Sequence, residues 1–305
     1  MNIYPNYYKE FKCIAGKCKH NCCIGWEIDI DEDTLGFYNC VEGEFGKTLK
    51  DNINYCDIPH FKLGKNERCP FLNENNLCEI IINLGEDALC DICTQHPRFH
   101  NELPDRVESG LGLCCEEAAR LILSQREKTT LVGNSNTNDK IILLRDKVID
   151  ALQNRTKGIN KRIDDMLSLC KTSLVERPIK SYCDLLISLE TLDEKWEELL
   201  LSLKEKASNI DYASFESHIS GREFEYEQFL VYLIYRHFAN SPNLEEAQKR
   251  ARFTAFSYTL LYYLGALTYH TKGEFNFEDQ VELTRLFSSE IEYSDENLYT
   301  LFDVL

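Results

Sequence analysis

The second half of the chain carries apolar residues at the spacing of amphipathic helices. Three sets recur at the helical period: Ile141, Leu144, Val148 and Leu152; then Ile163, Met166, Leu167 and Cys170; then Leu185, Leu186, Leu189, Leu192 and Trp196. Residues 224–238 and 253–269 are apolar nearly all round and rich in aromatic side chains. Since helices of that kind are normally buried, we expect these two stretches to form the centre of a helical bundle.

The first half has a different pattern, with short segments and many turns. Residues 26–31 alternate apolar and acidic side chains, which predicts a short strand, and Asp31 or Asp33 can cap a helix that follows. Residues 129–139 are polar and contain Gly133, as a connector would. The sequence therefore predicts a mainly α protein, with a cysteine-rich metal-binding unit with short strands at 1–128, a linker at 129–139 and a helical bundle at 140–305.

Composition restricts the compartment and the partners. The chain has 305 residues, of which 43% are hydrophobic, so it can bury a substantial core. Its formal charge of -17 disfavours nonspecific binding to nucleic acid or an anionic membrane and favours a cationic partner, such as a lysine-bearing polypeptide. The first residues lack the basic start and apolar core of a signal peptide, and no apolar run reaches the length of a membrane span. We therefore expect a cytoplasmic protein.

In a reducing compartment, clustered cysteines indicate metal ligands or redox groups rather than disulfides. Ten of the 14 cysteines fall into four groups: Cys13, Cys18, Cys22 and Cys23; Cys69 and Cys78; Cys90 and Cys93; and Cys114 and Cys115. Such grouping predicts a zinc or iron-sulfur centre. Two tetrahedral zinc sites would use most of these thiols, whereas one cubane cluster would leave several for a second centre or for packing. Adjacent side chains diverge, so Cys22 and Cys23 can belong to different centres.

Single cysteines are more often packing residues than ligands, so Cys40 and Cys56 are predicted to be buried. Cys115 comes just before a predicted helix, whose amino end favours a thiolate.

Other side chains near the cysteines have two interpretations each. His96 and His100 can complete a mixed metal site. A histidine in such a position more commonly donates a hydrogen bond to a metal ligand or lies at the surface. Arg98 can pair with the carboxylate of a bound cofactor or with an internal aspartate. Trp26 can line a cofactor or lysine pocket. Three phenols that share a helical face can do the same, but such a stripe is more often core: Tyr226, Tyr232 and Tyr235.

Four segments, taken in order, resemble the flagellin lysine-N-methylase family: 11–26, 69–78, 93–98 and 115–121. This family belongs to the wider group of zinc- or iron-chelating domains with a CxxCxxCC signature. Cys90 and Cys114 stand where the family is expected to have a small polar residue, so we treat them as extra thiols. The metal ligands implied by the resemblance are Cys13, Cys18, Cys22, Cys23, Cys69, Cys78, Cys93 and Cys115.

The resemblance implies a protein-lysine N-methyltransferase that acts on flagellin or another lysine-bearing protein. It implies S-adenosylmethionine as methyl donor and an iron-sulfur cluster of the [4Fe-4S] type, with Arg98 and Trp26 as candidate cofactor-binding residues. Two alternatives remain: a zinc-stabilised binding module without catalysis, and an iron-sulfur redox or sensor protein. No GxGxxG loop occurs, so S-adenosylmethionine would bind in another way.

Methylation of lysine requires the neutral amine, so some group must accept its proton. Glu27, Asp29 and Asp31, together with the phenols named above, are the candidate acceptors, and the sequence does not choose among them.

Overall fold

The computed structural model describes residues 2–133 and 136–305. Met1, Asn134 and Ser135 lie outside the described residues, and with them part of the predicted linker 129–139. The protein is mainly helical, with 58% helix and 9% strand, as the sequence predicts. The chain divides into two compact units. We call Met1–Phe11 together with His100–Leu305 the helical unit, and Lys12–Phe99 the cysteine-rich unit.

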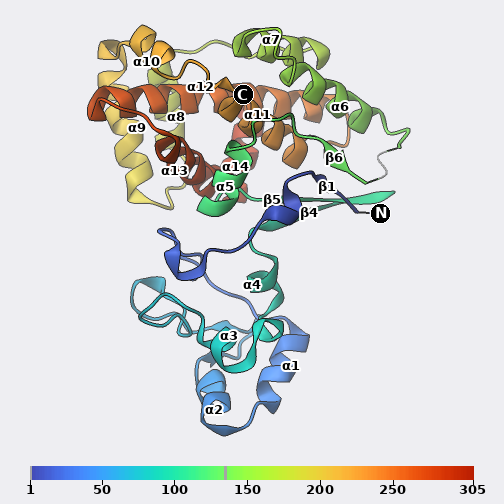
Figure 1. Cartoon of the computed structure of the whole chain (residues 1–305), viewed down its shortest axis with the longest axis vertical. Coiled ribbons are helices and arrows are strands. Elements are labelled where there is room, and N and C mark those ends of the chain that lie inside the picture. Colours follow the sequence, from blue (N-terminus) through green and yellow to red (C-terminus); the bar gives the residue numbers. More distant parts are fainter. Residues whose placement is uncertain (1, 134–135) are drawn as a thin grey trace. The chain divides into compact units, whose positions relative to one another are not determined.

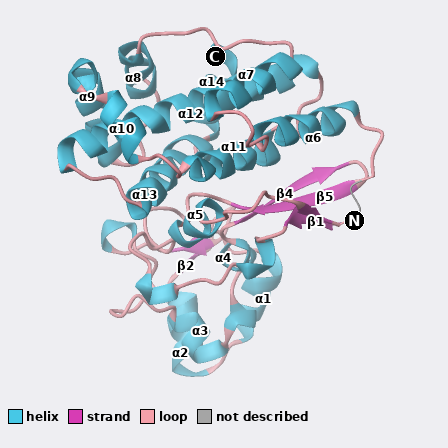
Figure 2. Cartoon of the chain, turned by 45° about the horizontal axis from the view of Figure 1, so that its top comes forward, coloured by secondary structure: helices cyan, strands magenta, loops and turns pink. Residues whose placement is uncertain are grey.

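The helical unit contains a small mixed sheet, drawn in magenta in Figure 2. Its strands lie in the order β4, β5, β1, β6, and their bounds are Arg98–Leu103, Arg106–Leu111, Asn2–Pro5 and Leu131–Val132. Strand β1 runs parallel to β5 and antiparallel to β6. The N-terminal strand is thus inserted between segments that follow it by about a hundred residues.

Ten α-helices make up the rest of the described helical unit, coloured from green to red in Figure 1. They are α5 Glu116–Leu123, α6 Lys140–Leu152, α7 Ile159–Leu169, α8 Ile179–Ile187, α9 Glu194–Lys206, α10 Tyr212–His218, α11 Glu223–His237, α12 Leu244–Lys272, α13 Phe277–Phe287 and α14 Asp295–Val304. A short π-helical turn, η6 Ser288–Glu292, joins α13 to α14. No helix among the described residues is long and apolar enough to cross a membrane.

Helices α11 and α12 form the centre of the bundle, as predicted. They pack against each other, and nearly every side chain of α11 is buried. The prediction of one continuous helix through Leu185 and Trp196 is wrong, because α8 ends at Ile187 and α9 begins at Glu194. Asp193 accounts for the break, since its side chain accepts a hydrogen bond from the backbone N–H of Lys195 and caps α9.

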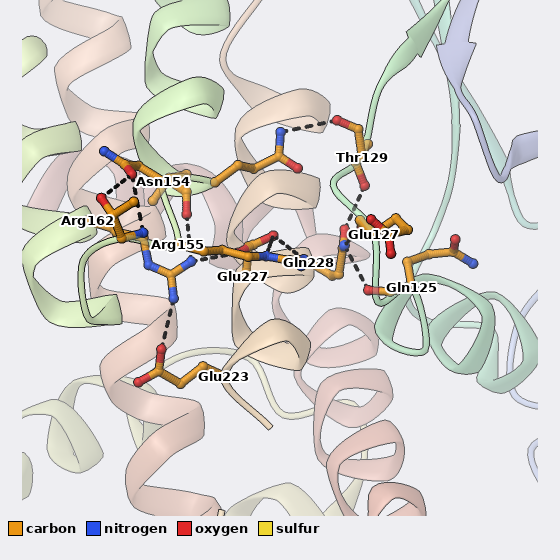
Figure 3. Close-up of polar contacts among 12 residues, drawn as sticks. Gln125, Glu127, Thr129, Asn154, Arg155, Arg162, Glu223, Glu227 and Gln228 are labelled. Carbon is orange, nitrogen blue, oxygen red and sulfur yellow. Dashed lines mark hydrogen bonds and ion pairs between the residues drawn. The ribbon is translucent and has the colours of Figure 1, made fainter. Parts of the chain in front are cut away.

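The compact units do not divide the chain at the predicted linker, because residues 100–128 belong to the helical unit. Helix α5 packs against α11 and α13. In Figure 3, Gln228 on α11 donates hydrogen bonds to the carbonyls of Gln125 and Glu127, at 2.9 and 2.8 Å. It also accepts one from the hydroxyl of Thr129 at 2.6 Å, so the start of the predicted linker is fixed to the bundle.

The cysteine-rich unit holds ten of the 14 cysteines. Its described elements are short: α1 Glu32–Cys40, α2 Gly43–Asp51, β2 Ile53–Asn54, β3 His60–Phe61, α3 Glu79–Leu84 and α4 Asp91–Gln95, with 3-10 turns at Ala15–Lys17, Lys65–Glu67 and Glu86–Ala88. Asp31 caps α1, as predicted, and the predicted strand at 26–31 is reduced to a single bridge from Asp29 to His60. The alternation itself holds, since Ile28 and Ile30 are buried in the core.

Candidate metal centre

Backbone pairing within the cysteine-rich unit brings three predicted ligands together. The N–H of Cys69 donates to the carbonyl of Cys23 at 2.9 Å. A turn that follows Cys69 returns the chain, so that Leu72 pairs with Cys78 in an antiparallel bridge. The polar residues 73–76 form the turn of this hairpin, in which the N–H of Asn73 donates to the carbonyl of Leu77 at 2.9 Å. Cys23, Cys69 and Cys78 therefore lie on neighbouring segments of one unit.

Cys90 and Cys93 join the same group. Cys90 precedes the first residue of α4, Cys93 lies in its first turn, and their Sγ atoms are 3.4 Å apart. Cys90 is almost fully buried. Cys90, which we treated as an extra thiol, therefore lies in contact with the predicted ligand Cys93. The two-residue gap between Cys90 and Cys93, a spacing typical of chelating pairs, is the sequence signal that points to it.

The hydrophobic core of the unit surrounds these thiols. Cys69 and Cys90 are buried members of a core that also contains Tyr38, Phe61 and Phe71. Cys23, Cys78 and Cys93 are partly buried and pack against that core. The five sulfur atoms thus lie where water reaches them poorly. Thiolates in such a place lose their hydration, and a bound metal ion would stabilise their charge instead.

Electrostatic coupling among the thiols supports this arrangement. Burial, with a smaller contribution from the nearby Cys78 and Cys90, raises the pKa of Cys69 to about 11. The pKa of Cys78 is raised by burial and by Cys90. Because thiolates at this range repel one another, they ionise together only when a cation lies between them.

Two pairs of thiols, Cys22 with Cys23 and Cys90 with Cys93, are each joined by a hydrogen bond between the sulfur atoms. Cys23 donates to the sulfur of Cys22, which lowers the pKa of Cys22 to about 7 and raises that of Cys23. Cys93 and Cys90 form the equivalent pair, with the pKa of Cys90 lowered and that of Cys93 raised by their hydrogen bond. Cys22 and Cys23 are thus in contact, although side chains at adjacent positions usually diverge.

The spacing of the sulfur atoms bears on the kind of centre. Among the described residues, no three thiols have all their sulfur atoms within 4.8 Å of one another. A single tetrahedral zinc ion holds its ligands close together, whereas a cubane cluster spreads them, because each thiolate binds a different iron. The Sγ atoms of Cys90 and Cys93 lie 3.4 Å apart, closer than thiolates on two different irons, so the thiol donor set fits either kind of centre.

The remaining predicted ligands lie in other surroundings. Cys13 is exposed and its sulfur accepts a hydrogen bond from the N–H of Ala15 at 3.3 Å. Cys18 donates to the carbonyl of His20 at 3.2 Å. Cys114 and Cys115 belong to the helical unit, where Cys115 immediately precedes α5, as predicted. Metal ligation stays a prediction for all eight cysteines: Cys13, Cys18, Cys22, Cys23, Cys69, Cys78, Cys93 and Cys115.

Trp26, predicted to bind a cofactor, lies beside the thiols. Its indole N–H donates to the carbonyl of Cys22 at 2.5 Å, and its ring lies 6.2 Å from that of His96. Burial lowers the pKa of His96 to about 4, so this imidazole is neutral at pH 7. The guanidinium of Arg98 donates to the carbonyl of Thr94 at 3.4 Å. His100 belongs to the helical unit and bonds the hydroxyl of Ser109 at 2.8 Å.

The single cysteines divide into two kinds. Cys170 and Cys183, in the helical unit, are fully buried, as expected for packing residues. Cys40 and Cys56 are exposed, so the prediction that they are packing residues is wrong. Cys40 ends α1 and Cys56 lies in the loop between β2 and β3, where the chain is at the surface.

The candidate proton acceptors also differ in their roles. Burial alone would raise the pKa of Asp31. Hydrogen bonds from the N–H groups of Asp91 and Thr34 outweigh burial, so the pKa of Asp31 is lowered overall. Asp31 is thus a structural acceptor that joins α1 to α4. Glu27 and Asp29 are exposed and lie near His60. The three phenols are core, as the commoner interpretation predicts: Tyr226, Tyr232 and Tyr235.

The fold and the thiol group define a mainly helical protein with a small cysteine-rich unit. The family model described as FliB lysine N-methylase C-terminal domain matches residues 110–305. The chain therefore belongs to this family. The match covers most of the helical unit.

Individual relatives agree with the family. The chain is 28% identical over 148 residues to the flagellar biosynthetic protein FliU of Salmonella muenchen. This match covers 46% of this chain and 88% of FliU. It is 30% identical over 149 residues to the lysine-N-methylases of Salmonella typhimurium and Salmonella choleraesuis. That match covers 44% of this chain and only 36% of each of these two relatives. No solved structure matches the chain.

Proposed function

We propose that the chain is a protein-lysine N-methyltransferase. The observation that carries the proposal is the family match over residues 110–305, together with relatives named lysine-N-methylase. Because the matched segment covers only 36% of those relatives, the activity is proposed for this chain rather than transferred from them.

The proposed substrate is flagellin, with the methyl group supplied by S-adenosylmethionine. The relative FliU is named as a flagellar biosynthetic protein, which supports a flagellar substrate. A net charge of -17 supports a lysine-rich surface as partner, since opposite charges accelerate encounter and orient the two proteins. The many reduced thiols are compatible with work in the cytoplasm.

The proposed metal group is a [4Fe-4S] cluster held by thiols of the cysteine-rich unit. The residues that would hold it are drawn from Cys23, Cys69, Cys78, Cys90 and Cys93, which the core of that unit surrounds. When bound, such a cluster supplies a redox centre or an iron atom that accepts a further ligand.

The substrate amine must lose a proton before it attacks a methyl group, because lysine at its usual pKa of about 10.4 is protonated at pH 7. The phenols of Tyr226, Tyr232 and Tyr235 are poor acceptors, since burial raises the pKa of each far above its ordinary value. Among the sequence candidates, Glu27 and Asp29 have exposed carboxylates, which a substrate amine can reach from solvent.

The experiment is transfer of label from methyl-labelled S-adenosylmethionine to purified flagellin, followed by amino-acid analysis for methyl-lysine. We expect label on lysine, in proportion to the amount of enzyme and absent without it. Flagellin whose lysine amines have been blocked chemically is the control. Anaerobically purified protein that leaves flagellin and a cell extract unlabelled would overturn the proposal and would favour a binding module or a redox protein.

A further inference from the structure

A second group of potential metal ligands lies in the cysteine-rich unit, with a different donor chemistry. One ligand atom from each of Glu27, Asp29 and His60 lies within 4.8 Å of the other two. The group contains an imidazole nitrogen and carboxylate oxygens, and no sulfur. It lies outside the family match, which begins at residue 110.

The backbone holds these three residues on one face. Asp29 pairs with His60 in an antiparallel bridge, which places their side chains on the same side. Hydrogen bonds on either side fix this register, from the N–H of Ile30 to the carbonyl of Pro59 at 2.7 Å and from that of Phe61 to the carbonyl of Ile28 at 3.1 Å. Ile28 and Ile30 point into the core, so Glu27 and Asp29 must point away from it.

The two ring nitrogens of His60 have different neighbours. Nδ1 lies 2.9 Å from the carbonyl oxygen of Ile58 and 3.6 Å from Sγ of Cys56. The thiol of Cys56 donates to the same carbonyl at 3.2 Å, and a carbonyl can only accept, so Nδ1 carries a proton and donates it. In the neutral ring Nε2 then holds a lone pair. Asn54 on β2 can donate its amide to this nitrogen at 3.1 Å.

A carboxylate faces the same lone pair. Oε2 of Glu27 lies 3.1 Å from Nε2 of His60. Two lone pairs at this separation repel each other, so a cation shared between them makes the contact favourable, and a cation bound at Nε2 would take the place of the Asn54 amide. That cation is either a second proton on the ring or a metal ion. An imidazole that donates Nδ1–H to a backbone carbonyl and presents Nε2 to carboxylates is the usual arrangement of a metal-ligating histidine.

We propose that Glu27, Asp29 and His60 bind a divalent first-row transition-metal ion. Imidazole nitrogen suits zinc, iron and nickel, and carboxylate oxygen suits manganese, so Mn²⁺, Fe²⁺ and Zn²⁺ are the ions that this donor set accepts best. Three protein ligands leave coordination positions for water or another small ligand. Glu27 is 58% exposed and His60 15% exposed, so the ion would be open to solvent on the carboxylate side.

The test is Mn²⁺ binding to the full chain, purified anaerobically so that its thiol centre is kept. Free Mn²⁺ is counted from its electron paramagnetic resonance signal, because hard Mn²⁺ binds oxygen and nitrogen donors in preference to thiolates. We expect one saturable site for each chain. Glu27→Gln and His60→Ala should each weaken it by about tenfold or more, as loss of a ligand does. Glu27→Gln keeps the shape of the side chain and guards against misfolding.

Asp33→Asn is the matched control, because Asp33 is an exposed carboxylate in the first turn of α1, near in sequence. It should bind Mn²⁺ as the unchanged chain does. The proposal is overturned if no saturable site is found, or if Glu27→Gln binds Mn²⁺ undiminished. It is also overturned if nitrogen NMR shows a doubly protonated His60 that Mn²⁺ does not displace, which would make the shared cation a proton. The readout is independent of methylation, so failure of the proposed function would not affect it.

Discussion

The Sγ atoms of Cys90 and Cys93 lie 3.4 Å apart at the beginning of helix α4, inside the core of the cysteine-rich unit. This contact makes Cys90 a member of the thiol group. We expect Cys90→Ser to lower the metal content of the purified protein as strongly as Cys93→Ser does. Cys40→Ser is the control, because Cys40 is an exposed thiol of the same unit and should leave the metal content unchanged. Full metal content in Cys90→Ser would remove Cys90 from the ligand set.

Removal of the metal should unfold the cysteine-rich unit locally. Its core includes Cys69 and Cys90, and without a cation the crowded thiols must stay protonated to avoid mutual repulsion. We expect a chelator to open Lys12–Phe99 to limited proteolysis, while the bundle around α11 and α12 stays resistant. Peptide mapping by mass spectrometry reads both units at once. Equal protection with and without the chelator would show that the metal does not stabilise this unit.

Glu227 on α11 is the centre of a buried ion-pair network, shown in Figure 3. Its carboxylate accepts hydrogen bonds from Arg162 at 2.5 Å and from Arg155 at 2.9 Å, and both Glu227 and Arg162 are buried. Replacing Glu227 leaves the buried guanidinium of Arg162 with only the exposed carboxylate of Glu223 as a charge partner. We expect Glu227→Gln to lower the free energy of unfolding by roughly 3–5 kcal/mol, as measured by urea denaturation.

Glu223 provides the matched control for that network. It pairs with the same Arg162 at 3.0 Å but is 53% exposed. Exposed pairs contribute little, so Glu223→Gln should cost less than about 1 kcal/mol. Equal losses in the two variants would contradict the assignment of the buried carboxylate as the stabilising group.

Glu290, in the π-helical turn, makes stability depend on pH. Burial raises its pKa from 4.5 to about 7, although the N–H of Leu192 donates to Oε2 at 3.0 Å. Between these two pKa values Glu290 is ionised in the unfolded chain but protonated in the folded protein. The free energy of unfolding therefore falls as pH rises from about 4.5 to 7 and stays low above pH 7.

We therefore expect Glu290→Gln to stabilise the protein at pH 8 by roughly 1–3 kcal/mol and to have little effect near pH 4.5. Thermal unfolding at several pH values measures the difference. Glu296→Gln is the control, because Glu296 is exposed at the start of α14. A gain at pH 4.5 that equals the gain at pH 8 would mean that ionisation of Glu290 is not responsible.

Periodicity predicts the helical part of the fold well, because long amphipathic patterns such as that of α6 report directly which side is buried. It fails at residues 188–193, where the apolar spacing continues through a break that Asp193 imposes. It also gives no sign that the first strand, Asn2–Pro5, pairs with β5, since such pairing joins segments far apart in sequence.

The candidate site shows the same limit. Spacing groups Cys69 with Cys78 and Cys90 with Cys93, whereas the resemblance implies Cys93 without Cys90 as a ligand. The proximity of Glu27 and Asp29 to His60 has no sequence signal, because the pairing of residues 28–30 with 59–61 depends on tertiary structure. Cys40 and Cys56 are exposed because they lie where short elements end, and composition does not predict where those elements end.

The account depends most on one inorganic centre shared by the thiols of the cysteine-rich unit. The most direct test is the iron and acid-labile sulfide content of the anaerobically purified protein, measured with its visible absorption spectrum. We expect iron and sulfide in equal amounts, a brown protein, and loss of both in Cys69→Ser. Protein that carries zinc without sulfide, or that contains no metal and still methylates flagellin fully, would contradict the account.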